Sequence, residues 1–145
     1  MPVQNIKHGK YVVELAPGYS MYKQITAPQI SAFGERDLNG VNFSLGYSYL
    51  TKPFLMVMDS HKHEFDQVIF FLGGDGSNVV EFDGEAEFTV DGKKYSITYP
   101  ACVYLPKGTV HGPLDIKRVS KPMMFIDITL HTGPSIRPLP PQSQK

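Results

Sequence analysis

The chain has 145 residues, a length that fits one domain with its own hydrophobic core. Hydrophobic residues make up 41% and charged residues 19%, with 14 basic and 14 acidic side chains, which excludes a disordered composition. Because the formal net charge is zero and no basic run is present, we expect neither nucleic acid nor an anionic membrane as a partner. The single Cys102 excludes an internal disulfide, and no apolar run predicts a signal peptide or reaches the roughly 18 residues of a membrane span. We therefore expect a reducing, cytoplasmic setting.

Apolar and polar residues alternate with a period of two through most of the chain, without the helical periodicity of βαβ units. This pattern predicts an all-β sandwich or barrel. The candidate strands, in chain order, are 11–15, 41–50, 54–58, 67–72, 78–82, 85–90, 93–98, 102–105 and 124–130. Residues 21–35 have the least clear pattern, and we expect a short helical turn with loop there.

Two Asp-Gly pairs, Asp83-Gly84 and Asp91-Gly92, each stand between two candidate strands. Asp-Gly suits the positive φ angles of tight hairpin turns, so the pairs predict an antiparallel meander over about 78–98. The segment 133–145 holds four prolines among polar residues and is predicted to be a surface tail. The predicted domain therefore spans 1–132.

Three of the five histidines fall in two short segments. His61 and His63, at a spacing of two, point to the same side if the backbone is extended, and neutral imidazole is the commonest metal ligand. On their own, two surface histidines beside a turn are the simpler interpretation. His111 follows the turn formed by Pro106 and Gly108, which aims its side chain back towards the sheet interior.

Taken together, the two segments resemble the two motifs of the cupins. The first motif has the form G(x)5HxH(x)3-4E(x)6G, and its spacing is matched by His61, His63, Gln67 and Gly74. The second has the form G(x)5PxG(x)2H(x)3N, and it is matched by Pro106, Gly108 and His111. The resemblance implies a small single-domain cupin, a double-stranded β-helix or jelly-roll-like barrel, here with extra N-terminal strands.

The chain departs from both motifs at a few positions. Leu55, Pro100 and Asp115 replace turn or scaffold residues, and Gln67 replaces the glutamate ligand. The resemblance implies that one divalent transition metal, Zn, Ni, Fe or Mn, is held by His61, His63, Gln67 and His111. An amide in place of a carboxylate leaves one more positive charge on such a site and makes the metal a stronger Lewis acid.

Two alternatives for this position remain open. Gln67 also fits a polar residue at a strand start that hydrogen-bonds the backbone, and Glu64 or Asp66 fits a fallback ligand if the turn is irregular. If Gln67 is a ligand, a carboxylate substituted for it is expected to keep or tighten the metal.

Further side chains are candidates for the pocket. If Gln67 faces the barrel interior, Ile69 and Phe71 face it too and form an apolar wall. Tyr104 is a candidate catalytic phenol and Glu81 a candidate general acid or base, although a packed tyrosine and a solvent-facing carboxylate are the simpler interpretations.

The last candidate strand alternates two sets of side chains. Its aliphatic set is expected to pack between the sheets, which leaves Asp127 and Thr129 facing solvent or an oligomer contact unless the pocket accepts them. His8 and His131 lie outside both motifs and are expected at the surface.

The resemblance implies a metal-dependent cupin enzyme acting non-oxidatively, by ketonisation, isomerisation, lyase or decarboxylation chemistry, on a small oxygen-rich acid. An Fe or Mn dioxygenase and a non-catalytic small-ligand-binding cupin remain alternatives. A homodimer is expected, because pairing removes the exposed edges of an antiparallel sandwich.

Overall fold

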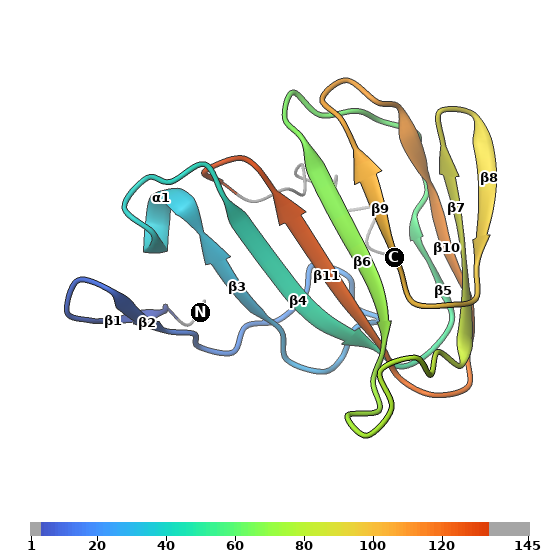
Figure 1. Ribbon diagram of the computed structural model, residues 1–145, viewed down its shortest axis with the longest axis horizontal. Coiled ribbons are helices and arrows are strands. Elements are labelled where there is room, and N and C mark those ends of the chain that lie inside the picture. The colour runs from blue at the N-terminus through green and yellow to red at the C-terminus, as the bar shows by residue number, and fades with distance from the viewer. Residues whose placement is uncertain (1–3, 134–145) are drawn as a thin grey trace.

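A computed structural model of the chain describes residues 4–133 (Figure 1). Within this range it contains eleven strands and one short helix. In chain order the elements are β1 (Ile6–His8), β2 (Val12–Glu14), β3 (Ile30–Phe33), α1 (Gly34–Asp37), β4 (Ser44–Leu50), β5 (Phe54–Val57), β6 (Gln67–Gly73), β7 (Gly84–Val90), β8 (Lys93–Ile97), β9 (Ala101–Leu105), β10 (His111–Val119) and β11 (Met123–Thr129). The protein is therefore almost entirely β, as the alternating pattern predicts.

The strands form two facing antiparallel sheets and a separate hairpin. One sheet has five strands in the order β3-β4-β11-β6-β9, and the other has four in the order β5-β10-β7-β8. The β1–β2 hairpin pairs only with itself and projects beyond the larger sheets (Figure 1). The predicted extra N-terminal strands are thus present, while the proline-rich tail lies outside the described residues except for Gly133. No helix within 4–133 has the length and apolar character needed to cross a bilayer.

The core lies between the two sheets and is built by strand alternation. In β6, Gln67, Ile69 and Phe71 are buried in turn, and the ring of Phe71 contacts those of Phe88 and Phe125 with centroids 6.4 and 5.5 Å apart. Such tilted aromatic contacts stabilise a core beyond the area that they bury. The predicted apolar wall beside Gln67 is confirmed.

Several predicted elements differ from the structure. Residues 78–82 form turns rather than a strand, and Gly84 begins β7 instead of sitting in a hairpin turn. Only Asp91-Gly92 makes the predicted turn, with φ of 51° and 76°, so the meander reduces to the β7–β8 hairpin. Strands β1, β3 and β10 are not predicted by the pattern. β10 escapes prediction because Gly112 and Pro113 interrupt its start and Lys117 and Arg118 break its alternation.

One backbone contact joins the two histidine segments. The peptide N–H of His61 donates to the carbonyl of His111 at 2.9 Å, and the N–H of His111 donates to the carbonyl of His61 at 2.8 Å. Gly112 makes this approach possible, because it has a φ of +104° and a Cβ there would lie 2.3 Å from the carbonyl oxygen of Asp59. The hydroxyl of Ser60 also donates to the Gly112 carbonyl at 3.0 Å.

Gly112→Ala is expected to be more damaging than a substitution that only forces an alanine into positive φ. Gly92, with φ +76° and no atom within 4 Å of an added Cβ, is the matched control. Gly92→Ala should lower the free energy of unfolding by about 1–2 kcal/mol, and Gly112→Ala by roughly a further 1–3 kcal/mol because of the clash. Chemical denaturation of both variants measures the difference. Equal losses of unfolding free energy would show that the backbone at Asp59 moves away from the added Cβ without measurable cost.

Candidate metal centre

The three motif histidines lie at one end of the barrel. His61 and His63 belong to the connection between β5 and β6, and His111 is the first residue of β10. The turn before His111 is tied to the other segment, since the N–H of Gly108 donates to the carbonyl of His63 at 2.9 Å. Two backbone contacts, at His61 and at His63, therefore fix one histidine segment against the other.

The histidine side chains converge. One ligand nitrogen from each of His61, His63 and His111 lies within 4.8 Å of the other two, a separation at which one metal ion can be shared. Their ring centroids are 4.5 to 5.2 Å apart. His111 is buried, with 4% of its surface exposed, whereas His61 and His63 are half-buried. The cluster is thus buried on the side of His111 and accessible to solvent on the side of His61 and His63.

Hydrogen bonds set which nitrogen of each ring is available. The Nδ1 of His111 lies 2.9 Å from the carbonyl of Thr109, and the Nδ1 of His61 lies 3.3 Å from the carbonyl of Asp59. A carbonyl only accepts, so in both rings Nδ1 carries the proton and Nε2 carries the lone pair that a metal requires. Burial lowers the pKa of His111 despite the opposing effect of the Thr109 hydrogen bond. His111 is therefore neutral, and competent as a ligand, around neutral pH.

The burial and hydrogen bonding of the Gln67 amide test whether this residue could bind a metal. Its side chain is 5% exposed, and its Nε2 donates to Oδ1 of Asp127 at 2.8 Å. Its Oε1 is buried, and no group within residues 4–133 hydrogen-bonds to it. An unpaired buried amide oxygen costs free energy, so this atom needs a partner such as a metal ion or an ordered water. Three imidazole nitrogens, with an amide oxygen as a fourth donor, would suit a divalent transition metal.

Asp127 and Thr129 lie inside the barrel, and the expectation that they face solvent is wrong. In β11 the buried set is Met123, Phe125, Asp127 and Thr129, while the alternate residues are only half-buried. Thr129 is fully buried and faces Gln67 across the β6–β11 ladder. Its Oγ1 also lacks a hydrogen-bond partner in the part of the chain that the structure describes. Both faces of β11 carry apolar residues, so the alternation alone does not say which set is interior.

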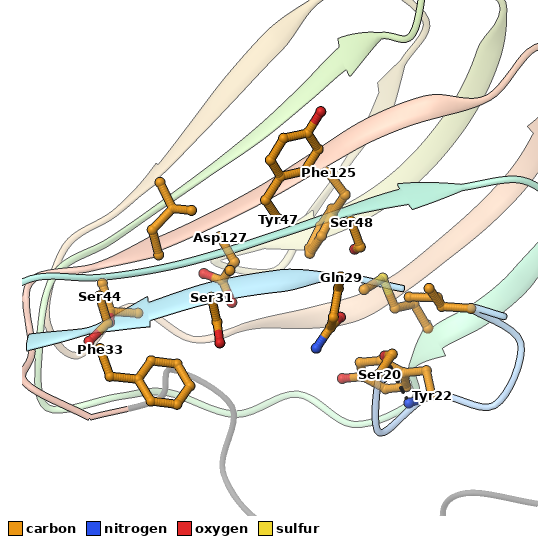
Figure 2. A pocket seen from close by; sticks show the side chains of 15 residues that line it. Ser20, Tyr22, Gln29, Ser31, Phe33, Ser44, Tyr47, Ser48, Phe125 and Asp127 are labelled. Carbon is orange, nitrogen blue, oxygen red and sulfur yellow. Dashed lines mark hydrogen bonds between the residues drawn. The ribbon is translucent and has the colours of Figure 1, made fainter. Parts of the chain in front are cut away.

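A small cavity borders this polar row (Figure 2). It has a volume of about 80 Å³ and lies against the inner faces of β3, β4 and β11, with the segment 20–25 covering it. Its polar lining includes Ser20, Gln29, Ser31, Ser44, Ser48, Asp127 and Thr129. Asp127 therefore links the cavity to Gln67.

Tyr104 and Glu81 are not brought to the histidines. Tyr104 is 62% exposed on the outer face of β9, next to Leu105, which points inwards and is 1% exposed. Glu81 pairs with Lys121 at 2.9 Å, and its carbonyl approaches Gly73, the last residue of β6. Gln67 is the first residue of the same strand, roughly 20 Å away by strand rise.

Other predicted residues take defined positions. Asp66 accepts a hydrogen bond from the Lys107 N–H at 2.8 Å, which occupies one oxygen of a fallback ligand, and Glu64 is exposed. His131 is exposed as expected, but its ring stacks on Phe65 at 4.7 Å, and Phe65 stacks on His63 at 4.9 Å. This row of rings beside the metal centre has no sequence signal, since Phe65 lies in a loop.

Comparison with known proteins supports the fold. No protein-family profile matches the sequence, and no curated protein matches it. A cupin protein from Bacteroides fragilis superposes with a TM-score of 0.50 at 14% identity, over 79% of this chain and 85% of that one.

Two larger proteins contain a similar unit. Bacillus subtilis oxalate decarboxylase, described with Mn(II) centres, matches with a TM-score of 0.53 at 11% identity, over 83% of this chain and 28% of that one. AerE from Microcystis aeruginosa matches with a TM-score of 0.53 at 15% identity, over 88% of this chain and 50% of that one. With its two facing antiparallel sheets and its convergent histidines, the chain has the cupin fold.

Proposed function

We propose that the protein is a metal-dependent enzyme that acts non-oxidatively on a small oxygen-rich acid, by ketonisation, isomerisation, lyase or decarboxylation chemistry. The observation that carries this proposal is the donor set: three convergent imidazoles and the unpaired, buried Oε1 of Gln67. All four donors are neutral. A divalent metal bound there keeps its full charge, polarises a carboxylate or carbonyl oxygen, and stabilises negative charge that develops next to it.

The protein's own residues hold and shield this centre. Ile69 and Phe71 continue inwards from Gln67 as an apolar wall, which excludes water from the deep side. His61 and His63 leave the opposite side more open, where Phe65 and His131 provide flat faces for a planar acid. The same fold holds Mn(II) centres in oxalate decarboxylase, whose substrate is named as a small acid. This supports the proposed substrate class.

Neither Tyr104 nor Glu81 has a part in this proposal, because Tyr104 is 62% exposed and Glu81 forms an ion pair with Lys121. The homodimer and the cytoplasmic location stay predictions. The edge strands are β3 and β9 in one sheet and β5 and β8 in the other, and a second copy would pair at such an edge.

Metal binding is the first expected outcome. Protein prepared without a His tag should contain close to one transition metal ion per chain by elemental analysis. His61→Ala and His111→Ala should each lose it, while their cores stay folded because sheet packing supplies that stability. His8→Ala, which changes an exposed histidine paired with Glu14 in the projecting hairpin, is the matched control and should load like the parent. An apo parent that takes up no Zn, Ni, Mn or Fe would refute the proposal.

Turnover decides between the two enzyme classes. Keto acids and unsaturated sugar acids are to be screened under strict anaerobiosis with Zn or Ni in the site, and turnover there is expected because Lewis-acid chemistry needs no oxidant. Turnover only with Fe or Mn, with O2 consumed in proportion to product, would instead establish a dioxygenase. Tight, saturable binding of one metabolite without turnover would establish a binding protein.

A further inference from the structure

We propose that Asp127 is a positioning residue that fixes the side-chain amide of Gln67, so that the amide presents its oxygen and not its nitrogen to the metal centre. The inference rests on the proposed function, since it concerns one of the proposed ligands. It adds a residue that neither cupin motif contains, on a strand that follows both motifs in the chain.

The strand register places the two side chains together. Gln67 pairs with Thr129 across the β6–β11 ladder, and Asp127 pairs with Ile69, so Gln67 and Asp127 are diagonal neighbours on one face of the sheet. Both side chains are buried, with 5% and 8% of their surfaces exposed. The hydrogen bond from Gln67 Nε2 to Asp127 Oδ1 measures 2.8 Å. At this burial neither group exchanges its partner for bulk water at low cost.

The chemistry of the two groups determines the direction of the amide. A carboxylate oxygen accepts hydrogen bonds and an amide has a single donor end, so the atom of Gln67 that faces Asp127 must be Nε2. A rotation of the amide by 180° would place two acceptor oxygens in contact and turn the NH2 group, which cannot bind a metal, towards the ligand position. Because Nε2 makes the hydrogen bond to Asp127, Oε1 is the amide atom that is left without a hydrogen-bond partner among the described residues. Asp127 therefore leaves only the amide oxygen of Gln67 available to bind a metal.

This contact replaces the expectation that a carboxylate at position 67 keeps or tightens the metal. After Gln67→Glu, an acceptor oxygen would lie against Oδ1 of Asp127 where Nε2 now donates. That substitution alone should lower the metal affinity at least tenfold, although glutamate is the usual ligand of the motif. Adding Asp127→Asn restores a donor, because an amide at position 127 can donate to the new carboxylate and leave its second oxygen for the metal.

The test is a double-mutant cycle of Gln67→Glu and Asp127→Asn, read by metal competition against a chelator and by melting temperature in EDTA. The double variant should recover metal affinity to within about threefold of the parent and should melt above Gln67→Glu in the metal-free state. Asp127→Leu, which leaves Nε2 without an acceptor, should weaken metal binding by about 10–100-fold. It should also change the visible spectrum of the cobalt-loaded protein. Ser48 is a buried polar residue that lines the same cavity. Ser48→Ala is therefore the matched control and should change neither the metal affinity nor the cobalt spectrum.

The outcomes separate this inference from the proposed function. Gln67→Glu that binds metal as tightly as the parent, or a double variant no better than Gln67→Glu, would overturn the role of Asp127 while leaving the metal centre in place. A parent that binds no metal would overturn both. If Asp127→Leu fails to fold, the cycle of the two conservative substitutions still decides, because each keeps the volume of its side chain.

Discussion

The reciprocal backbone pair between His61 and His111 is the contact on which the site depends. Fifty residues separate the two histidines in the chain, and the pair holds them as opposite residues of one antiparallel bridge. Side chains of directly opposed residues lie close together, so the approach of the His61 and His111 rings, with centroids 4.5 Å apart, follows from the backbone. Gly112 is the requirement behind this geometry, because only a residue without a Cβ fits beside the Asp59 carbonyl. The site is thereby built into the fold before any ligand arrives.

A second constraint comes from the polar row that the barrel accepts in its interior. Gln67, Asp127 and Thr129 occupy inward positions that hydrophobic residues fill further along the same strands. Two of their polar atoms have no partner among the described residues, which is unfavourable for folding alone. The hydrophobic contacts around Phe71 offset this cost at the other end of the core. Departures from a purely apolar interior are expected at functional sites, and here they lie at the end of the barrel that carries the histidines.

The sequence is enough to predict the all-β class, the three histidines and the inward face of β6, because each depends on local spacing. The sequence does not predict the features that depend on which strands are neighbours in the sheets. β10 pairs with β5 and β7 through irregular register, and its Gly112, Pro113 and adjacent basic residues hide its strand character. Asp127 lies on the interior face and not on the predicted one, because β11 is apolar on both sides and only its pairing with β6 reveals the interior set. Tyr104 shows the same limit, since one step along β9 separates an inward from an outward side chain.

The three histidines are unequally buried, so the site has a buried side and an exposed side. His111 is held from behind by Phe88, whose ring stands perpendicular to it at 6.2 Å, and by the core below. His61 and His63 are half-buried, and the ring row of Phe65 and His131 extends from His63 to the surface. The histidine cluster is therefore more exposed on the side of the β5–β6 connection, which is where we propose that a small acid approaches it. On the buried side, Gln67, the proposed fourth ligand, donates through Nε2 to Oδ1 of Asp127. If Gln67 and the three histidines hold a metal as proposed, the deeply buried donor and the more exposed histidines would leave the exposed side of the site for a substrate.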